Sequence, residues 1–518
     1  MQITGFMRQA VALSPQGIAT ICEERSRSWA ELADRVPRMA GALQSLGVQP
    51  DEFCAVLSMN TDRYLELFFA IPWAGGCFAP MNVRWSAAEN LYALKDCGAR
   101  VLFVGTDFVA QARELAAQTD LRALIYIGEG DTPEGMLGYE ELITASSPAP
   151  DAGRGGEDRY AVFYTGGTTG NPKGVLFTHQ ALCMASIAYL SMLPDSEDLR
   201  HAYVGGFFHF SGASAVLYIS ITGGSHVILP KFEPRSMLQA ISRHRVTNAV
   251  MVPTMIQMML NDPDFPRYDT SSLRTLIYGG SPIPRELAEE AAKKLPTWRF
   301  YQIYGMTETG GFATMLRWRD HRFEGEKAHR IASCGQPAPG VELRIVCPET
   351  GRDLGCDEVG EIVVRSDYLM REYLSRPEQT AEVLKDGWMF SGDAGRIDAD
   401  GYLYVADRVK DMIVTGGENV YSIEVERALY SHPAVLQAAV IGIPSPEWGE
   451  AVHAIILPRD GQTVTEAELI AHCRGLIGGY KCPKSVSFRS EPLPVGPAGK
   501  VQKQILRAPW WDSRETKI

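Results

Sequence analysis

The first third of the chain alternates short apolar runs with amphipathic stretches. The runs FCAVLSM (53–59), VLFVG (101–105) and LIYI (124–127) are rich in β-branched and aromatic residues, which favours buried strands. Residues 62–73 and 108–117 carry apolar positions at helical spacing. Strands that alternate with helices predict βαβ units and a mostly parallel sheet. A stretch rich in proline, glycine and aspartate at 145–158 is expected to be a loop.

The same alternation returns after this loop and then stops. Strand-like runs occur at 160–165, 226–230, 248–252, 275–280 and 300–305, which predicts a second α/β layer. Beyond residue 335 the segments GVELRIV (340–346), GEIVVRS (360–366) and 395–408 indicate antiparallel strands. The last of these is expected to be a hairpin that turns at residues 398–401. We therefore expect a separate β subdomain here.

The last hundred or so residues predict a small α+β unit. An amphipathic helix is expected to open near the capping pattern Thr463-x-x-Glu466, with strands on both sides of it. The loop PVGPAGK (494–500) follows these elements. The expected fold is therefore α/β: a large N-terminal part of two parallel-sheet α/β subdomains plus a β subdomain, followed by a small α+β C-terminal unit.

Composition narrows the class of protein. The 518 residues are 45% hydrophobic and 22% charged, proportions of a globular chain that can bury a large core. The net charge of −12 opposes broad attraction to nucleic acid or anionic lipid. Residues 481–507 differ, because they hold six basic side chains and one acidic one. An acidic body with a basic C-terminal edge suits a small anionic ligand held between two parts.

The ten cysteines are scattered and form no C-x-x-C pair, which argues against a zinc site or a disulfide framework. Residues 1–20 lack the features of a secretory signal, and no segment has the roughly 18 clean apolar residues of a membrane span. We expect a soluble, cytoplasmic protein with free thiols, no nucleic-acid partner and no membrane span. The oligomeric state is open, and a homodimer is one option.

The segment YTGGTTGNPKG (164–174) follows a strand-like run and holds four glycines, three threonines and one lysine. Such a loop can turn its N–H groups and hydroxyls toward phosphate oxygens, because glycine permits a close approach of the backbone. The segment is not a Walker P-loop, since Pro172 precedes Lys173 and Gly174 follows it. Taken alone, it could also be a flexible surface turn.

The order of residues in this segment resembles the phosphate loop of the adenylate-forming superfamily, which contains acyl-CoA synthetases, aryl-CoA ligases, luciferases and peptide-synthetase adenylation domains. Six later segments resemble further motifs of that superfamily, in the same order along the chain: LIYGGSPIP (276–284), YQIYGMTET (301–309), GQPAPGVELRIV (335–346), GWMFSGDAGRID (387–398), DRVKDMIVTGGENVYSIEVE (407–426) and PAGKVQKQILR (497–507).

The resemblance implies a reaction in two steps. A carboxylate attacks the α-phosphate of ATP and releases pyrophosphate, and the thiol of coenzyme A then displaces AMP to give a thioester. Both partners of the first step are anions, so fixed cations and dipoles must stabilise the reacting centre. The implied co-substrates are ATP and coenzyme A, with Mg²⁺ as the metal and a small carboxylic acid as the partner.

The resemblance also implies roles for individual residues. Thr165 and Glu308 would hold Mg²⁺, and Thr307 would donate to the α-phosphate. The segments 280–282 and 302–304 would enclose the adenine, with the ring of Tyr304 stacked on it. Asp393 would accept hydrogen bonds from the ribose hydroxyls, with Arg408 beside it. The full set implied to bind ATP is Thr165, Gly166, Gly167, Thr168, Thr169, Gly170, Lys173, Gly280, Ser281, Pro282, Gln302, Ile303, Tyr304, Asp393, Arg408 and Lys500.

Two lysines of the C-terminal part are implied to act in different ways. Lys500 corresponds to the catalytic lysine of the superfamily, whose ammonium bridges the substrate carboxylate and the α-phosphate. Lys410 corresponds to the hinge about which the C-terminal domain rotates between the two steps. The resemblance thus implies an N-terminal domain of residues 1–409 and a small mobile C-terminal domain of residues 410–518. Rotation would exchange the loop of Lys500 for the TGGEN segment (415–419). The residues expected to contact coenzyme A are Gly416, Gly417, Trp448, Lys481 and Lys484.

The segment FFHFSG (207–212) occupies the place of the acyl-pocket motif. Peptide-synthetase adenylation domains carry an aspartate there, whereas this segment offers no carboxylate for a substrate ammonium. His209 is expected to be catalytic, as a gate near the reacting carboxylate, or else to be a packed structural histidine. The expected pocket consists of Phe207, His209, Phe210, Ser211, Tyr278, Gly279, Ile303, Gly305, Gly310, Gly311 and Phe312.

We therefore expect an acid–CoA ligase for a medium- or long-chain fatty acid, or for an aryl or alicyclic acid. Three other functions stay open at this point. The chain could load an acyl group onto a carrier protein, it could be a luciferase-like oxygenase, or it could be a catalytically silent acyl- or nucleotide-binding protein. Ser422, where many relatives have proline, departs from the superfamily pattern.

Overall fold

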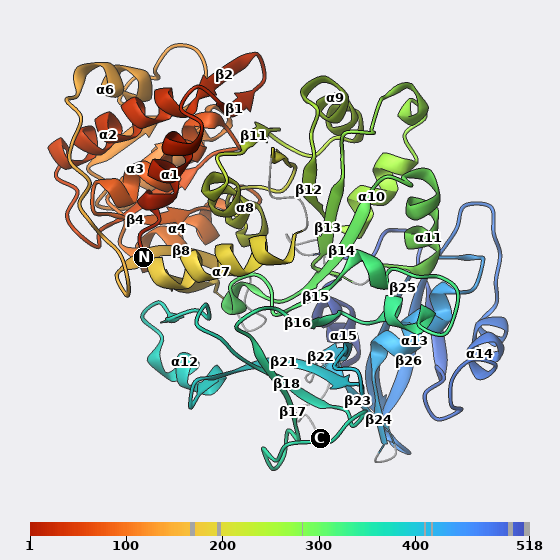
Figure 1. The fold of residues 1–518 in the computed structure, drawn as a ribbon. Coiled ribbons are helices and arrows are strands. Elements are labelled where there is room, and N and C mark those ends of the chain that lie inside the picture. The colour runs from red at the N-terminus through yellow and green to blue at the C-terminus, as the bar shows by residue number, and fades with distance from the viewer. Residues whose placement is uncertain are drawn as a thin grey trace.

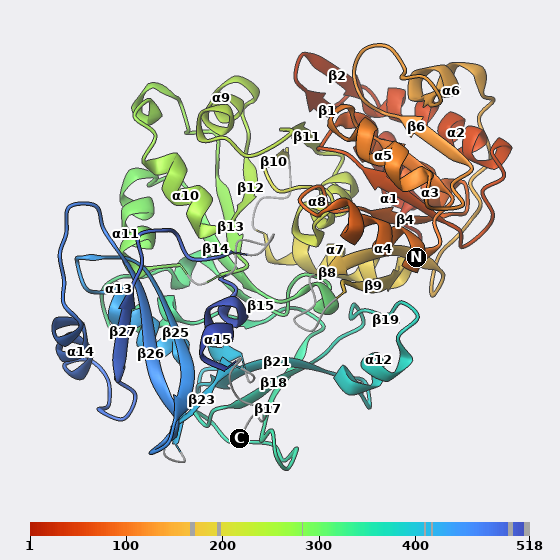
Figure 2. The ribbon, with the colours of Figure 1, turned by 180° about the vertical axis from the view of Figure 1, so that it is seen from behind.

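A computed structural model describes residues 1–165, 171–193, 198–281, 283–408, 411–415, 418–495 and 501–511, without the side chains of residues 407, 408, 418 and 419. Within these ranges the chain forms two large sheets, a smaller antiparallel sheet and a C-terminal sheet with its own helices (Figure 1). Figure 2 shows the same arrangement from behind.

The first large sheet has the strand order β19-β9-β8-β4-β3-β5-β6-β7. Its centre is parallel, and β8, β9 and β19 are joined antiparallel. All five residues of β3 are buried, which explains why its sequence is continuously apolar. The strands are β3 (Phe53–Leu57), β4 (Cys77–Pro80), β5 (Val101–Val104), β6 (Ala123–Tyr126), β7 (Leu137–Gly138), β8 (Arg159–Thr165), β9 (Lys173–Thr178) and β19 (Glu372–Tyr373).

Six helices accompany this sheet, and side-chain caps define where several of them begin. Ser28 and Ser86 each form a capping box with the glutamate three residues later, and the Thr61 hydroxyl accepts from the N–H of Tyr64. The helices are α2 (Trp29–Ser45), α3 (Asp62–Trp73), α4 (Ala87–Cys97), α5 (Val109–Ala116), α6 (Tyr139–Ala145) and α7 (His179–Met192).

The second large sheet has the order β16-β15-β14-β13-β12-β10-β11-β1-β2. Its centre from β14 to β1 is parallel, as the alternation of elements predicts. The strands are β1 (Ile18–Cys22), β2 (Arg25–Ser28), β10 (Arg200–Tyr203), β11 (Ser225–Ile228), β12 (Asn248–Met251), β13 (Thr275–Gly279), β14 (Arg299–Tyr304), β15 (Thr314–Leu316) and β16 (Gln336–Pro337). The helices are α1 (Thr4–Leu13), α8 (Phe210–Ile221), α9 (Pro234–His244), α10 (Pro253–Leu260) and α11 (Arg285–Lys294).

An antiparallel sheet follows, as expected from the change in pattern after residue 335. The turn at 398–401 joins β21 to β22, with the N–H of Gly401 donating to the carbonyl of Asp398 at 2.9 Å and with Gly401 at φ +80°. The elements are β17 (Glu342–Val346), β18 (Gly360–Arg365), α12 (Pro377–Val383), β20 (Leu384–Lys385), β21 (Trp388–Ile397) and β22 (Leu403–Arg408).

The C-terminal unit has the strand order β24-β23-β26-β25, with β27 parallel to β26. Its helix α14 begins two residues later than expected, because Thr465 and Glu468 form the capping box in place of Thr463 and Glu466. The elements are β23 (Ile413–Thr415), β24 (Glu418–Val420), α13 (Ser422–Tyr430), β25 (Val435–Ser445), β26 (Gly449–Pro458), α14 (Glu466–Arg474), β27 (Ser485–Phe488) and α15 (Lys503–Trp511).

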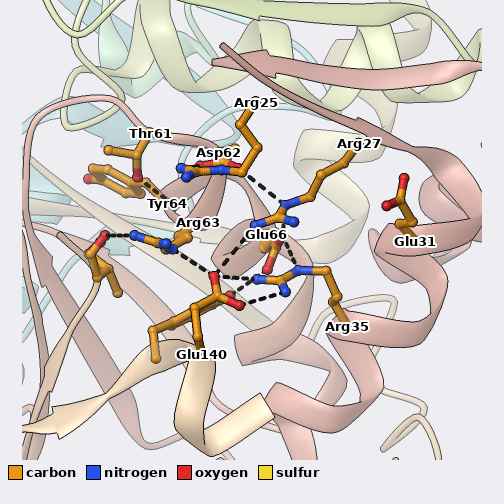
Figure 3. Close-up of polar contacts among 12 residues, drawn as sticks. Arg25, Arg27, Glu31, Arg35, Thr61, Asp62, Arg63, Tyr64, Glu66 and Glu140 are labelled. Atoms are coloured by element: carbon orange, nitrogen blue, oxygen red, sulfur yellow. Dashed lines mark hydrogen bonds and ion pairs between the residues drawn. The ribbon is translucent and has the colours of Figure 1, made fainter. Parts of the chain in front are cut away.

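A cluster of buried charges joins the N-terminal segment to the first sheet (Figure 3). Glu66, on α3, is fully buried and accepts hydrogen bonds from Arg35 at 2.7 Å and from the hydroxyl of Tyr139 at 2.8 Å. Glu140 accepts from Arg35 and from Arg63. The cluster balances four arginines against four carboxylates: Arg25, Arg27, Arg35, Arg63, Asp62, Glu66, Glu129 and Glu140.

These observations confirm the expected fold class, with a large N-terminal part and a smaller C-terminal unit. The division at residues 409 and 410 stays a prediction, because both residues lie outside the described ranges. Within those ranges, no helix is both long enough and apolar enough to cross a membrane.

Candidate active site

The candidate phosphate loop connects two paired strands. β8 ends at Thr165 and β9 begins at Lys173, and these two residues are direct partners in the antiparallel register. The five residues between them that were expected to contact phosphates, Gly166, Gly167, Thr168, Thr169 and Gly170, lie outside the described ranges. The strands thus place the threonine and the lysine at one end of the first sheet, on either side of the loop.

Glu308 is held by Tyr373, whose ring also lies near Lys173 at the start of β9. Glu308 belongs to the 3₁₀ turn Thr307–Thr309, and 7% of its surface is exposed. The Tyr373 hydroxyl donates to Glu308 Oε1 at 2.8 Å, and Lys173 Nζ lies 5.1 Å from the centre of the Tyr373 ring. Tyr373 is in β19, which pairs with β9. One aromatic side chain therefore connects the phosphate-loop lysine with the predicted metal-binding glutamate.

This geometry fits magnesium. Within the described part of the chain, no group donates a hydrogen bond to Glu308 Oε2, so a hard carboxylate oxygen is available as a ligand. The described residues also contain no group of three or more His, Cys, Asp or Glu side chains that could hold a metal. Magnesium is commonly bound by one or two carboxylates together with substrate phosphates, which matches a site with a single glutamate.

The residues expected to bind the adenosine lie at the ends of adjacent strands. Gly280 and Ser281 follow β13, while Gln302, Ile303 and Tyr304 end β14, the parallel neighbour of β13. Ligands of open α/β sheets bind outside the carboxyl ends of such strands. Pro282 lies outside the described ranges. Gln302 is additionally tied to Cys334, with its Nε2 donating to Sγ at 3.6 Å.

Tyr304 and Asp393 form the link between this sheet and the antiparallel sheet. The Tyr304 hydroxyl donates to Asp393 Oδ2 at 2.9 Å, and burial together with the nearby carboxylate raises the pKa of Tyr304 well above its ordinary value. Asp393 is itself 8% exposed and lies opposite Arg408 in the β21–β22 register. The structure thus brings the predicted adenine residue and the predicted ribose residue into direct contact.

Six of the predicted pocket residues line one cavity: Phe210, Ser211, Ile303, Gly310, Gly311 and Phe312. The cavity lies between α7 and α8 and has a narrow interior of about 40 Å³, room for only a few water molecules. Sequence reasoning did not find the remaining walls, which come mostly from the two helices. These are Phe68, Tyr160, Phe163, Leu182, Ala185, Ser186, Tyr189, Ala213, Ser214, Leu217, Tyr218 and Val250.

The other predicted pocket residues lie elsewhere. Phe207 is fully buried, with its ring against Tyr64, Phe68 and Tyr203. The Tyr278 hydroxyl lies 2.9 Å from His321 Nε2. Gly279 and Gly305 lie where neighbouring backbone leaves no room for a side chain. A Cβ on Gly279 would lie 2.6 Å from the Ile303 carbonyl oxygen, and one on Gly305 would lie 2.5 Å from Phe312 Cα.

His209 lies at the start of α8. Its side chain is exposed, and Nδ1 accepts from the N–H of Ser211 and lies 2.9 Å from the Ser211 hydroxyl. The histidine therefore caps the helix whose first residues line the cavity.

The residues expected to contact coenzyme A are partly brought together. Lys484 Nζ lies 5.8 Å from the centre of the Trp448 ring, and 42% of the Trp448 surface is exposed. Lys481 is instead paired with Glu424, at 2.7 Å. Gly416, Gly417, the hinge candidate Lys410 and the catalytic candidate Lys500 all lie outside the described ranges, as does the side chain of Arg408.

The chain on either side of residues 496–500 is described. Val495 and Val501 form an antiparallel bridge, and α15 begins two residues later. In both ribbon views α15 lies between the C-terminal sheet and β15, whereas the β23–β24 hairpin lies at the far end of the C-terminal unit (Figures 1 and 2).

Comparisons with known proteins match almost the whole chain. The family described as AMP-binding enzyme matches residues 7–374, and the AMP-binding enzyme C-terminal domain matches residues 424–500. The chain belongs to the AMP-binding enzyme family. The motif resemblance stated above is thereby confirmed.

Individual relatives agree with this assignment. A feruloyl-CoA synthase from Amycolatopsis sp. is 38% identical over 496 residues, 96% of each chain. An indoleacetate–CoA ligase from Aromatoleum aromaticum is 34% identical over 511 residues, 98% of each chain. Among solved structures, the amide bond synthetase McbA from Marinactinospora thermotolerans superposes with a TM-score of 0.87 at 30% identity, covering 98% of this chain and all of that one.

Proposed function

We propose that the protein is an AMP-forming acid–CoA ligase that activates an apolar carboxylic acid with ATP. One observation carries the proposal: the short segment 303–312 reaches the acyl cavity, the predicted ribose residue and the residue that holds the predicted metal ligand. Ile303, Gly310, Gly311 and Phe312 line the acyl cavity, Tyr304 contacts Asp393, and Glu308 contacts Tyr373. A nucleotide bound on one side of this segment and an acid bound on its other side would have their reacting groups close together.

In the first step, the charges around the phosphate loop would balance those of the two anionic reactants. Lys173 and the loop N–H groups would face the β- and γ-phosphates, and Thr307 would donate to the α-phosphate. Glu308 and Thr165 would hold Mg²⁺, which when bound neutralises phosphate charge. Asp393 would accept from the ribose hydroxyls, with Tyr304 fixing the position of its carboxylate.

Lys500 would supply the cation at the reacting carboxylate. The positions of α15 and of the β23–β24 hairpin support this, because α15, which follows the Lys500 loop, lies beside the N-terminal part (Figure 2). The structure would then correspond to the adenylation step. Rotation about Lys410 would bring the TGGEN hairpin, together with Trp448 and Lys484, to the site for attack by the coenzyme A thiol.

The acid is expected to be apolar and singly charged. The cavity is walled by aromatic and aliphatic side chains, and none of its described lining residues is charged. A substrate ammonium or a second carboxylate would therefore be buried without a partner. Fatty, aryl and alicyclic acids remain the candidates at this level, and the feruloyl-CoA and indoleacetate–CoA relatives support the aryl class.

A screen of pyrophosphate release tests the proposal. The acids are acetate, octanoate, palmitate, benzoate, cinnamate and cyclohexanecarboxylate, each with and without coenzyme A. We expect release with at least one apolar acid, and a thioester when coenzyme A is present. Acyl-AMP without a thioester would indicate a carrier protein as the acceptor instead. Absence of pyrophosphate release with every acid would contradict the proposal and favour a silent binding protein.

The role of Lys500 is tested by separating the two half-reactions. Lys500→Ala should lose adenylation, while still converting supplied acyl-AMP to the thioester. Lys503→Ala is the matched control, because Lys503 belongs to α15 and is paired with Glu426 at 2.8 Å. It should keep both steps. An equal loss of both steps in Lys500→Ala would contradict the assignment.

A further inference from the structure

Asp96, at the end of α4, accepts hydrogen bonds from residues of two segments that reach the candidate active site. The Tyr164 hydroxyl donates to Asp96 Oδ2 at 2.9 Å, and Arg376 Nη2 donates to Asp96 Oδ1 at 2.8 Å. The same Arg376 nitrogen donates to the hydroxyl of Tyr92, one helical turn before Asp96. Only 9% of the Asp96 side chain is exposed, so the carboxylate is largely shielded from water. It therefore joins β8 to the segment that follows β19.

Tyr164 holds the end of β8 behind the candidate phosphate loop. It directly precedes Thr165, the residue at which the loop leaves the strand. Because successive side chains of a strand point to opposite faces, Tyr164 packs into the same buried cluster as Leu374 while Thr165 points the other way. The Tyr164 ring lies against Gly174, the facing residue of β9, where an added Cβ would lie 3.1 Å from Tyr164 Cε1. The bond to Asp96 thus fixes this ring, and with it the backbone at the start of the loop.

Arg376 holds the turn that carries Tyr373. The Arg376 N–H donates to the Tyr373 carbonyl at 3.0 Å, and the Thr380 hydroxyl donates to the Arg376 carbonyl at 2.8 Å. The Thr380 hydroxyl also accepts from the Tyr373 N–H at 3.0 Å, so the three residues form one hydrogen-bonded turn. The Arg376 guanidinium ties this turn to Asp96, and the Tyr373 hydroxyl holds Glu308. A displacement of Arg376 would therefore move the residue that orients the predicted metal ligand.

We infer that Asp96 is a positioning residue for nucleotide binding, which holds the start of the phosphate loop and the turn of Tyr373 in fixed positions relative to each other. The inference rests on the proposed function and adds to it a residue that lies outside every segment resembling a superfamily motif. Asp96 acts through Tyr164 and Arg376 and does not touch the nucleotide. A carboxylate suits this role because its two oxygens accept from the phenol and from the guanidinium at the same time, whereas an amide offers one acceptor oxygen.

Nucleotide binding in the absence of an acid tests this role. Isothermal titration calorimetry at saturating Mg²⁺ gives the dissociation constant of ATP for the wild-type protein and for Tyr164→Phe. Phenylalanine keeps the buried ring and removes only the hydrogen bond to Asp96. Because a hydrogen bond to a charged group is stronger than one between neutral groups, its loss should raise the dissociation constant about tenfold.

Pyrophosphate release separates positioning from a general loss of structure. Neither Asp96 nor Tyr164 lines the acyl cavity, so in Tyr164→Phe the KM for the acid should stay within about twofold of wild type while the KM for ATP rises about tenfold. A purely structural defect would lower the amount of active protein and leave both KM values unchanged. If the wild-type protein binds ATP and Tyr164→Phe binds it equally well, the positioning role is overturned and the ligase proposal is untouched. If the wild-type protein binds no ATP, the ligase proposal fails and the positioning role fails with it.

Tyr139→Phe is the matched control. It also removes a buried hydrogen bond from a tyrosine to a carboxylate, since the Tyr139 hydroxyl donates to Glu66 Oε2 at 2.8 Å, but it does so far from the phosphate loop. Its dissociation constant for ATP should equal that of wild type, and an increase as large as in Tyr164→Phe would overturn the inference. If Tyr164→Phe does not fold, Asp96→Asn decides. This variant keeps the shape of the side chain and removes the charge paired with Arg376, so the dissociation constant should rise at least threefold, and an unchanged value overturns the inference.

Discussion

The hydroxyl of Tyr373 donates a hydrogen bond to the carboxylate of Glu308 at 2.8 Å, although 65 positions separate the two residues. The same ring lies under the ammonium of Lys173. In the proposed function Lys173 would bind the nucleotide and Glu308 would bind its metal, whereas Tyr373 is not expected to touch the reacting atoms. We therefore interpret Tyr373 as a positioning residue that fixes the orientation of the Glu308 carboxylate.

Tyr373→Phe keeps the ring and removes the hydrogen bond. Because a hydrogen bond to a charged group contributes about 1.5–3 kcal/mol, the Mg²⁺ concentration for half-maximal pyrophosphate release should rise about tenfold or more. Tyr126→Phe is the control, since its hydroxyl donates to the Glu129 carbonyl in a different part of the chain. An unchanged Mg²⁺ dependence in Tyr373→Phe would show that the contact does not position the metal ligand.

Lys410→Pro tests the proposed hinge. Proline fixes φ near −65°, so rotation of the C-terminal unit should be blocked while the first step is spared. Adenylation should stay within about twofold of wild type, and conversion of supplied acyl-AMP to the thioester should fall by at least tenfold. Lys410→Ala removes the charge without fixing φ and should keep both steps. The hinge is refuted if both variants behave alike.

Glu66→Gln tests the buried charge cluster of Figure 3. Burial raises the pKa of Glu66 in spite of Arg35, and removal of its charge would leave buried guanidinium groups short of a partner. Loss of one member of a buried ion pair typically costs about 3–5 kcal/mol, so the urea midpoint should fall markedly. Asp34→Asn breaks only the exposed pair with Arg38 and should cost less than about 0.5 kcal/mol. Similar midpoints for both variants would contradict this account.

Three buried histidines should make stability depend on pH. Burial lowers the pKa of His179 and of His201 to about 4 and that of His226 to about 3, all from an ordinary value of 6.5. The unfolded chain therefore binds more protons between about pH 4 and pH 6.5. The stability that these neutral rings contribute is present above pH 6.5 and is lost as the pH falls through that window.

His226→Gln isolates one of these groups. The drop in unfolding free energy between pH 7.5 and pH 5.0 should shrink by about 2 kcal/mol in this variant, whatever the variant costs at neutral pH. Urea unfolding at the two pH values measures the difference. His329→Gln, at an exposed position, should leave it unchanged. A drop in His226→Gln as large as in wild type would mean that this ring is not the titrating group.

Local patterns predicted much of the architecture. The stretch 62–73, predicted to be helical from its apolar positions, coincides with α3. Thr61 caps the start of this helix, and the helix is buried on nearly every face. The turn at 398–401 was predictable from its glycine. The helix α14 begins two residues beyond the expected cap, since two threonines each precede a glutamate at the right spacing and only the tertiary packing chooses between them.

The candidate site was harder to predict from the sequence, because its contacts join segments that are far apart along the chain. Nothing local to Tyr373 indicates that it meets Glu308. Phe207 lies in the pocket motif, yet its ring turns into a cluster of aromatic residues from α3 and β10, and the cavity walls come instead from α7 and the later part of α8. Tyr189 and Tyr218 carry no motif at all. The buried charge cluster was also missed, since its charged residues look like those of exposed helix faces.

The strand β1 pairs with β11, so Thr20 lies opposite His226 in the second sheet. During synthesis on the ribosome, the partner of β1 emerges only after some two hundred further residues have been made. Until then, the backbone groups of β1 on that side remain bonded to water or to a chaperone. The pairing of β1 with β11 is therefore among the later steps in the assembly of the second sheet, and a fragment that ends before β11 should be prone to aggregate.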